Sequence, residues 1–253
     1  MKVIYETSGR AREYFELAAN LYTGCEYACR YCFGATVTHK DPKEFFGKPR
    51  PRDGVLRQLQ KDAARLPSNE IRHILLSFVT DPYQPLEEEL KITRRAILIL
   101  HAEVLSVAIL TKGGLRATRD FDLLNEADLF GVTLVFEDEA TRAIWEPYAA
   151  PTEERITTLR MAKERGISTW ASFEPVFSPD ETLSLIARSA AVIDVFKVGT
   201  LNYREEGKMI NWKRFAQDAV KLLDGLGANY YIKKDLARYI GKPEGITKGY
   251  VPT

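Results

Sequence analysis

Hydrophobic positions along this chain fall into two alternating patterns. Mostly apolar runs, rich in aliphatic and β-branched residues, predict buried strands at 15–21, 74–79, 104–111, 129–136, 168–173 and 192–198, and a short final strand at 230–232 is a further candidate. Between them, apolar residues at helical spacing predict helices at 53–66 (capped by Asp53), 87–100, 121–127, 151–165, 180–188 and 212–226. This alternation predicts parallel βαβ units and therefore an α/β protein.

Two architectures fit such a series of units. Six units are too few to close an eight-stranded barrel, so they predict either an open, partial (β/α)6 barrel of parallel strands or a flat, doubly wound sheet. The flat sheet would normally carry a glycine-rich loop after its first strand, but here cysteines follow that strand, which favours the partial barrel. Because no Ser- or Pro-rich linker interrupts the chain, we expect one domain over 1–253, with the barrel at about 14–236 and a short extension at 237–253.

Composition and charge point to no particular partner. The 253 residues include 36 Lys and Arg against 35 Asp and Glu, so no overall field attracts the protein to nucleic acid or to an anionic membrane. The N-terminus lacks the apolar segment of a signal peptide, and the longest apolar run, near 96–110, is interrupted by His101 and Glu103. These features predict a soluble cytoplasmic protein.

The three cysteines of the chain, Cys25, Cys29 and Cys32, lie within eight residues in a C-x3-C-x2-C spacing. A clustered, odd number of cysteines indicates a metal site rather than a disulfide framework. Three thiolates can bind three irons of a [4Fe–4S] cluster and leave the fourth iron open for a reactive ligand. A zinc knuckle completed by His39 and a set of buried free thiols are the alternatives.

The segment from Thr23 to Gly34 resembles the C-x3-C-x-Φ-C signature of the radical S-adenosylmethionine (SAM) superfamily, with Tyr31 as the aromatic Φ. Residues 78–87, 172–175 and 232–234 are similar to segments of spore photoproduct lyase relatives. The resemblance implies a partial (β/α)6 barrel whose open iron chelates the amino and carboxylate groups of SAM. It also implies reductive cleavage to methionine and a 5′-deoxyadenosyl radical that abstracts hydrogen from a substrate, with an electron donor such as flavodoxin or ferredoxin.

A SAM site needs acceptors for the ammonium and a contact for the adenine. Ser77, Thr80 and Asp81 follow the second predicted strand and are candidates for the ammonium. Thr80 resembles the place that the superfamily gives to a Gly-Gly-Glu segment, while Asp81 before a proline is also a common turn starter. Tyr31 and Phe33 are candidates for the adenine, with core packing as the alternative.

The ribose contacts are expected from the next strand ends. Thr133, with the acidic pair at 137–138, ends the fourth predicted strand, and Ser172 and Glu174 end the fifth. A carboxylate between an aromatic residue and a proline at a strand end requires a partner. The alternative for Glu174 is a salt bridge to Lys197, and the alternative for 137–138 is a solvated loop.

The hydrogen donor to the product is a separate question. The resemblance implies that spore photoproduct lyase uses an additional cysteine for this step, and this chain has no cysteine outside the loop. The same absence excludes auxiliary iron–sulfur clusters and cysteine-dependent methyl transfer. Tyrosines in loops are the remaining candidates, namely Tyr83, Tyr203 and also Tyr148, although such tyrosines commonly serve packing.

A basic stretch with two aromatic residues follows the cysteine loop, which suits a phosphate backbone. Its cations are Lys40, Lys43, Lys48, Arg50 and Arg52, and Lys112, Arg116 and Arg119 add to them after the third predicted strand. We therefore expect a nucleic-acid or nucleotide-like substrate that undergoes base modification or rearrangement, with a solvated surface loop as the alternative. A glycyl-radical activating enzyme and a non-catalytic relative that binds SAM and the cluster are the other two classes.

Overall fold

The computed structural model describes residues 2–67, 69–202 and 204–249 of the chain. Within these ranges one sheet contains nine strands in the order of the sequence. The strands are β1 (Ile4–Glu6), β2 (Leu17–Ala19), β3 (Ile74–Leu76), β4 (Val107–Thr111), β5 (Leu129–Thr133), β6 (Ser168–Phe173), β7 (Val195–Val198), β8 (Asn229–Ile232) and β9 (Ile246–Lys248).

The strands from β2 to β8 are all parallel, and β1 and β9 pair antiparallel at the two edges. The six predicted strands are therefore confirmed as parallel and sequential, and β8 joins them. The two edge strands were not predicted, because runs of three residues carry too weak a hydrophobic pattern. The α/β partial barrel is confirmed.

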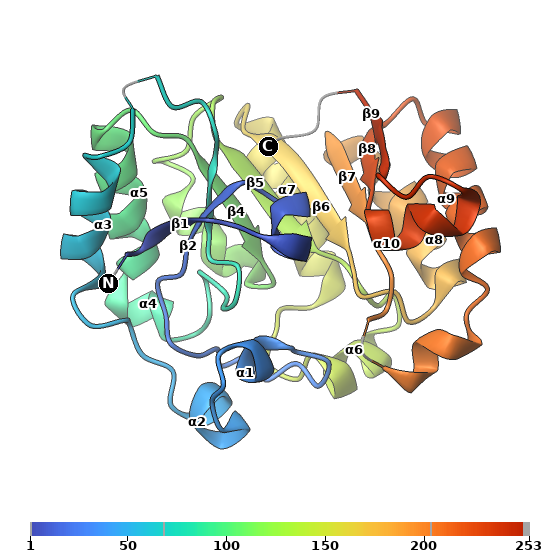
Figure 1. Ribbon diagram of the computed structural model, residues 1–253, viewed down its shortest axis with the longest axis horizontal. Helices are drawn as coiled ribbons and strands as arrows, with labels where there is room; N and C mark the ends of the chain where they lie inside the picture. Colours follow the sequence, from blue (N-terminus) through green and yellow to red (C-terminus); the bar gives the residue numbers. More distant parts are fainter. Residues whose placement is uncertain (1, 68, 203, 250–253) are drawn as a thin grey trace.

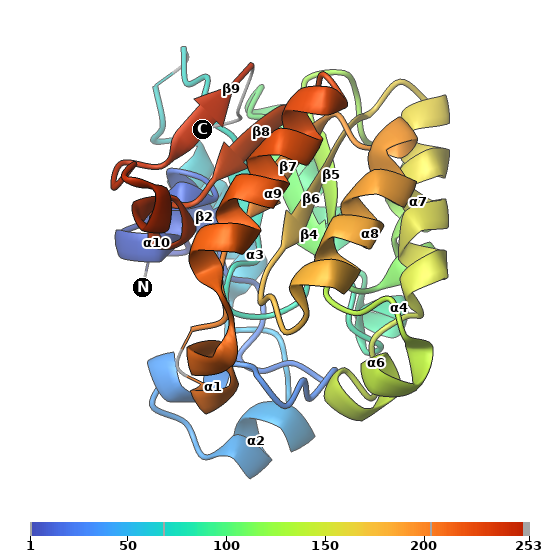
Figure 2. The same ribbon diagram turned by 90° about the vertical axis from the view of Figure 1, so that its right-hand side faces the viewer.

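Helices cover the outer face of the sheet, as parallel strands require. The α-helices are α1 (Gly34–Val37), α2 (Pro42–Gly47), α3 (Val55–Ala63), α4 (Glu87–Leu90), α5 (Ile92–Ala102), α6 (Glu139–Trp145), α7 (Thr152–Glu164), α8 (Pro179–Ser189), α9 (Trp212–Gly225) and α10 (Lys234–Ala237). The 3-10 helices are η1 (Gly9–Glu13), η2 (Gly114–Asp120), η3 (Ala190–Val192), η4 (Glu205–Met209) and η5 (Arg238–Ile240). Figure 2 shows α7, α8 and α9 side by side on one part of the sheet, and in Figures 1 and 2 α1, α2 and α6 lie together at one end of the barrel.

Several predicted bounds were wrong for local reasons. The helix expected at 121–127 is absent, because the side chains of Asn125 and Asp128 accept hydrogen bonds from backbone N–H groups and stabilise turns there. The helix expected at 87–100 is divided into α4 and α5 at Lys91, whose φ is 50°. Asp53 does not cap α3, since it forms an ion pair with Arg50.

Most strands are shorter than the apolar runs that predicted them. After Leu76, for example, the backbone N–H groups of Phe78 and Val79 donate to the side-chain oxygen of Asn20 instead of to a neighbouring strand. Both side chains are partly buried and pack against apolar clusters. Hydrophobicity therefore predicted apolar packing here and predicted strand length poorly.

The inner face of the barrel changes character along the strands. Its first layer is apolar and is filled by Phe15, Leu75, Ala108 and Trp170. Toward the carboxyl ends of the strands the inner positions become polar. A site at that end therefore has a closed apolar floor. No helix in the described ranges is both long and apolar enough to cross a membrane.

Candidate active site

The cysteine loop, residues 23–34, follows β2 and is held by backbone contacts on one side. The N–H of Cys25 donates to the carbonyl of Phe45 in α2 at 3.0 Å. Gly24 allows this approach, because a Cβ there would lie 2.1 Å from the same carbonyl oxygen. The Gln84 amide then donates to the carbonyl of Gly24 at 3.1 Å and accepts from the N–H of Glu26 at 2.9 Å. The loop is thereby fixed to the segment after β3.

The other side of the loop is tied to the end of β5 through a buried charge network. The Tyr31 hydroxyl donates to Glu146, which pairs with Arg155 at 2.5 Å between two fully buried side chains. Arg155 also donates to the carbonyl of Thr133 at 2.9 Å. Burial raises the pKa of Glu146, but the charges of Arg155 and Lys112 outweigh burial and lower it overall. The carboxylate is therefore ionised and holds the loop in place.

The three cysteines belong to one apolar cluster with Phe45, where Cys25 and Cys29 are buried. Burial raises the pKa of Cys29 to about 12, and the nearby Lys112 ammonium opposes this rise. Thiols in such a setting lose their protons when metal binds. No group of three His, Cys, Asp or Glu side chains in the described ranges lies close enough to hold a single metal ion. A four-iron cluster instead places each thiolate on a different iron.

The segment after β3 contains two buried side-chain polar atoms with no hydrogen-bond partner among the described residues, the hydroxyls of Thr80 and Tyr83. The polar neighbours of Thr80 are already occupied: Ser77 bonds the backbone of Ala19 and Leu21. The carboxylate of Asp81 accepts from Thr111 and from two backbone N–H groups. Of the three residues predicted to bind the ammonium, Ser77, Thr80 and Asp81, Thr80 is thus the one whose side chain has no partner in the described ranges.

A polar row crosses the inner face at the carboxyl ends of the strands. Thr133, Ser172, Lys197 and Tyr231 are directly opposite one another in the register of β5 to β8. Side chains in one register row point to the same face of a sheet. The two residues expected to contact ribose, Thr133 and Ser172, are therefore neighbours, and both are buried.

Glu174 lies one inner position beyond Ser172 and forms a compact polar cluster. Its carboxylate accepts from the Tyr14 hydroxyl at 2.7 Å, from Lys233 Nζ at 2.5 Å and from Asn202 Nδ2 at 3.3 Å. The Tyr14 oxygen is also 2.9 Å from Ser172 Oγ. The ion pair of Glu174 is thus with Lys233, and the alternative partner Lys197 was wrong.

Lys197 is occupied elsewhere, because its ammonium bonds the backbone carbonyls of Glu13 and Tyr14. It also lies 4.4 Å from the ring centroid of Phe15 and 5.3 Å from that of Trp170. Burial lowers the pKa of Lys197 to about 7, assisted by the positive charge of Lys233 and opposed by Glu13. Lys197 fixes the chain before β2 to the inside of the barrel.

The aromatic candidates for adenine lie in different surroundings. The Tyr31 ring packs against Phe136 and Phe177, with Lys112 Nζ 5.7 Å from its centroid. Phe33 is 43% exposed, and its ring centroid lies 5.8 Å from that of Phe78. Phe33 thus offers an open ring face beside the cysteine loop, while Tyr31 is engaged with the protein.

The candidate hydrogen donors are not brought together. Tyr83 is completely buried, and Arg119 lies over its ring on the outer, helical side of the sheet. A side chain in that position packs against the protein, and its role as a donor stays a prediction. Tyr148 is 67% exposed. Tyr203 lies outside the described residues.

The basic stretch lies at the same end of the barrel as the cysteine loop, since α2 contacts that loop directly. Several of its cations have local roles: Lys40 donates to the carbonyl of Thr23, and Arg50 pairs with Asp53. Lys43 and Lys48 are exposed. They are the cations of this stretch that the structure leaves at the surface for a ligand.

Two cations after β4 were expected to add to the basic surface, and that expectation was wrong. Arg116 pairs with Glu88 and donates to the carbonyl of Tyr83. Arg119 pairs with the buried Glu87 at 2.5 Å. Both guanidinium groups therefore hold the fold together.

The acidic pair at 137–138 also has structural partners, because Glu137 binds Ser184 and Arg188 while Asp138 caps α6. Sequence reasoning missed Tyr14 as part of the site. Tyr14 precedes β2 in an unremarkable polar segment, so no pattern marked it. Lys112 was singled out as a substrate cation, but the structure places it beside the thiols. Its position directly after β4, at the carboxyl end of a parallel strand, was the signal available.

Comparison with known proteins shows the family of the chain. Residues 19–191 match the radical SAM superfamily. The chain is 30% identical over 168 residues to an uncharacterized protein of Methanocaldococcus jannaschii, which is 64% of this chain and 60% of that protein. It is 25% identical over 249 residues to an uncharacterized protein of Acidianus two-tailed virus, covering 89% of this chain and 76% of that one. The chain thus spans less than two thirds of the archaeal protein.

Solved structures share the fold at low sequence identity. Spore photoproduct lyase complexed with dinucleoside spore photoproduct matches with a TM-score of 0.69 and 15% identity, over 90% of this chain and 78% of that one. SuiB of Streptococcus suis bound to S-adenosylmethionine matches with a TM-score of 0.60 and 12% identity, over 85% and 49%. With the superfamily match spanning most of the barrel and the cysteine loop at its mouth, the chain belongs to the radical SAM superfamily of enzymes.

Proposed function

We propose that this protein reductively cleaves SAM at a [4Fe–4S] cluster and abstracts hydrogen from a nucleic-acid or nucleotide-like substrate. The observation that carries the proposal is the cysteine loop, whose three thiols pack in one apolar cluster together with Val79, the residue before Thr80, whose hydroxyl has no partner in the described ranges. A polar atom of this kind requires a partner that the protein alone does not provide.

The residues present fit the cofactors. Cys25, Cys29 and Cys32 would hold three irons, and Thr80 would accept from the SAM ammonium, while Ser77 and Asp81 in the same segment are held by their own hydrogen bonds. When bound, the cluster and SAM supply an electron transfer that breaks a C–S bond to give methionine and a 5′-deoxyadenosyl radical. The protein's task is then to hold that site dry, because water and stray donors would divert a radical.

The polar groups on the inner face would orient the nucleoside part of SAM. Thr133 and Ser172 lie next to each other in the register and are proposed to meet the ribose, with Glu174 beside them. Phe33 and Tyr31 are proposed to contact the adenine, Phe33 through its open ring face. Tyr203 remains a proposed hydrogen donor.

The proposed substrate class rests on a shared fold and on exposed cations. One structure with the same fold is spore photoproduct lyase in complex with a dinucleoside. Lys43 and Lys48 are exposed on α2 next to the cysteine loop. A flavodoxin or ferredoxin is proposed as the source of the electron.

The decisive experiment is SAM cleavage by anaerobically reconstituted, dithionite-reduced protein. We expect stoichiometric methionine and 5′-deoxyadenosine by mass spectrometry, and neither from the Cys29→Ala variant treated identically. Protein that carries a full iron and sulfide complement and yet releases no 5′-deoxyadenosine would contradict the proposal. That result would favour a non-catalytic relative.

A further inference from the structure

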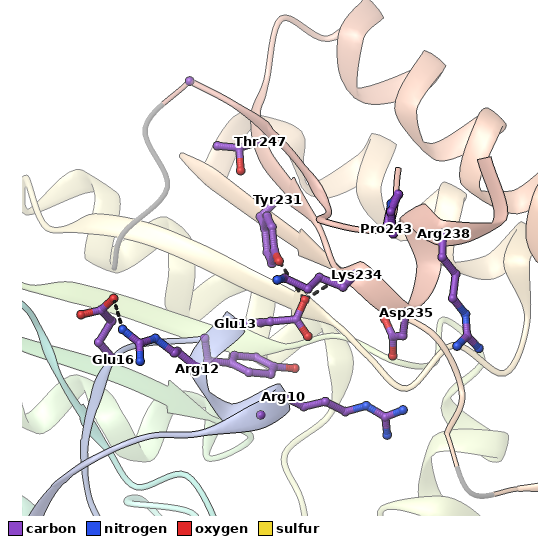
Figure 3. Close-up of a pocket in the computed structure, with 13 residues that line it drawn as sticks. Arg10, Arg12, Glu13, Glu16, Tyr231, Lys234, Asp235, Arg238, Pro243 and Thr247 are labelled. Carbon is purple, nitrogen blue, oxygen red and sulfur yellow. Dashed lines mark hydrogen bonds and ion pairs between the residues drawn. The ribbon is translucent and has the colours of Figure 1, made fainter. Parts of the chain in front are cut away.

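A second polar site lies between the two edges of the sheet, in a pocket of about 1000 Å³. We call it the edge pocket. Its walls come from the chain before β2 and from β8, α10 and the segment leading into and past β9 (Figure 3). The residues that line it are Gly9, Arg10, Arg12, Glu13, Tyr14, Glu16, Tyr231, Lys234, Asp235, Arg238, Pro243, Thr247 and Gly249.

The two walls of the edge pocket are joined at Glu13. Its carboxylate accepts from the Tyr231 hydroxyl and from the N–H of Lys234, each at 2.8 Å. These bonds connect residues that are 218 and 221 positions apart. The pocket is therefore formed by tertiary contacts that hold the barrel's two edges together, and its shape is fixed on both sides.

The cations that line the edge pocket differ in their partners. Arg12 pairs with Glu16 and Lys234 pairs with Glu244. Arg238 is exposed, and its only recorded contacts in the described ranges are with the neighbouring Tyr239 hydroxyl and ring. In the view of Figure 3, the side chains of Arg10 and Arg238 extend toward the same part of the pocket. A guanidinium presented in this way suits a phosphate.

An unmet acceptor lies on the same wall. Asp235 is 7% exposed, and one carboxylate oxygen accepts from Thr200 and from Asn202. The other oxygen, Oδ1, is buried and has no partner among the described residues. A buried carboxylate oxygen calls for a hydrogen-bond donor. The pocket thus combines a phosphate-binding cation with a site for an N–H or O–H group.

The edge pocket also touches the proposed SAM site. Asn202 donates to both Asp235 and Glu174, at 2.7 and 3.3 Å. Tyr14 lines the pocket, while its hydroxyl bonds Ser172 and Glu174 on the inner face of the barrel. Tyr14 and Asn202 therefore connect the pocket to the polar groups proposed to orient SAM.

We propose that the edge pocket binds the substrate as a phosphodiester-linked nucleotide, with Arg238 on a phosphate and Asp235 on a donor group of the base or sugar. The proposal rests on the proposed function and names the surface that the substrate uses. It places the phosphate contact at the sheet edges rather than at Lys43 and Lys48 on α2. A pocket of this volume is large enough for a nucleotide, whereas an exposed helix provides charge without enclosure.

The test is binding of a fluorescein-labelled single strand of about 12 nucleotides, as DNA and as RNA, by anisotropy with reconstituted protein. We expect Arg238→Glu to weaken binding about tenfold or more, because a charged hydrogen bond becomes a repulsion. Arg238→Gln should reduce the slope of log affinity against log salt by about 0.7, the loss of one phosphate contact on a single strand. Whichever of the DNA and RNA strands binds more tightly identifies the class of nucleic acid that supplies the nucleotide.

The matched control is the double variant Lys43→Glu, Lys48→Glu, which reverses two exposed charges on α2 and should change affinity by less than about twofold. An equal or larger loss in this control, or no effect of either Arg238 variant, would overturn the assignment. So would failure of the unaltered protein to bind either strand. Release of 5′-deoxyadenosine is measured on the same preparations, so intact SAM cleavage with unchanged binding by Arg238→Glu refutes the pocket alone.

Discussion

The cysteine loop and the edge pocket are built in opposite ways. The loop places three thiols within eight residues and surrounds them with apolar side chains and backbone hydrogen bonds. The edge pocket is formed by segments at the two ends of the chain, joined through Glu13 and lined mainly by charged side chains. The proposed radical chemistry thus depends on a short local segment, and the proposed recognition surface depends on tertiary structure.

This difference decides which of the two sites can be recognised from the sequence alone. A cluster needs fixed spacing of one residue type, so its site is visible in the sequence. A pocket between sheet edges needs only that distant residues converge, and no spacing records it. The two regions should consequently fail separately when they are altered.

The largest effect is expected from the loop. Cys29→Ala removes one of three thiolates, so iron and sulfide content and 5′-deoxyadenosine release should fall to background. Iron analysis and visible absorbance after reconstitution measure the first, and mass spectrometry the second. Oligonucleotide binding by the edge pocket should persist in the same variant. Stoichiometric tetrahedral zinc in anaerobically purified protein, with no iron–sulfur absorbance, would show that the loop has another role.

The cysteine loop also shows how much of the fold and of the candidate site could be predicted from the sequence. The order and direction of the strands followed from hydrophobic runs, and the thiol site followed from Cys25, Cys29 and Cys32. The partners of individual side chains did not follow. Glu174 pairs with Lys233, 59 positions away, and the sequence offered Lys197 equally well. Register decides between the two, because Lys197 bonds the chain before β2 instead.

Buried tyrosines show the same limit. Tyr83 follows a strand end and was a reasonable donor candidate, but its side chain turns to the helical side of the sheet beside Arg119. Tyr14 carried no pattern and nevertheless meets Ser172 and Glu174. Which way a loop side chain points depends on packing that no local pattern encodes.

The second-largest effect is expected from Lys197, which should make folding stability depend on pH. Its side chain lies inside the barrel and bonds the chain before β2. Its pKa of about 7 is below the ordinary 10.5 because burial penalises the charged form. Between these values the unfolded chain binds more protons, so folding stability should rise with pH. From pH 7.5 to 9.5 we expect a gain of about 2–3 kcal/mol in the free energy of unfolding.

Lys197→Met should remove this rise, as measured by urea unfolding at several pH values. The exposed Lys208, replaced by Met in the same way, should leave the slope unchanged. A wild-type stability that is flat from pH 7.5 to 9.5 would mean that the surrounding rings of Tyr14, Phe15 and Trp170 keep Lys197 charged. The cluster content of both variants should match that of the parent, since neither lysine contacts the loop.

A third effect tests the unmet hydroxyl beside the loop. Thr80→Val keeps the shape of the side chain and removes one acceptor, which should lower the affinity for SAM about tenfold. Stability should stay equal or increase, because an unpaired buried hydroxyl is lost. Thr158→Val, at a buried threonine that bonds within α7, is the control and should leave SAM binding unchanged. If Thr80→Val destabilises the fold and spares SAM binding, the hydroxyl serves structure.

The smallest effect is expected from Tyr31, because its hydroxyl is one of two side-chain partners that Glu146 has among the described residues. Tyr31→Phe removes the hydroxyl that donates to Glu146 but keeps the ring beside Phe136 and Phe177. Glu146 retains Arg155, so its charge stays paired and the loss should be about 1 kcal/mol, or roughly 2–4 °C in Tm for a chain of this length. The KM for SAM should change little, because a phenyl ring preserves any stacking contact. Differential scanning calorimetry and initial rates measure the two quantities. A large rise in KM with unchanged Tm would show instead that the hydroxyl itself contacts SAM, which would move the adenine site from the open ring face of Phe33 to the buried side of the loop.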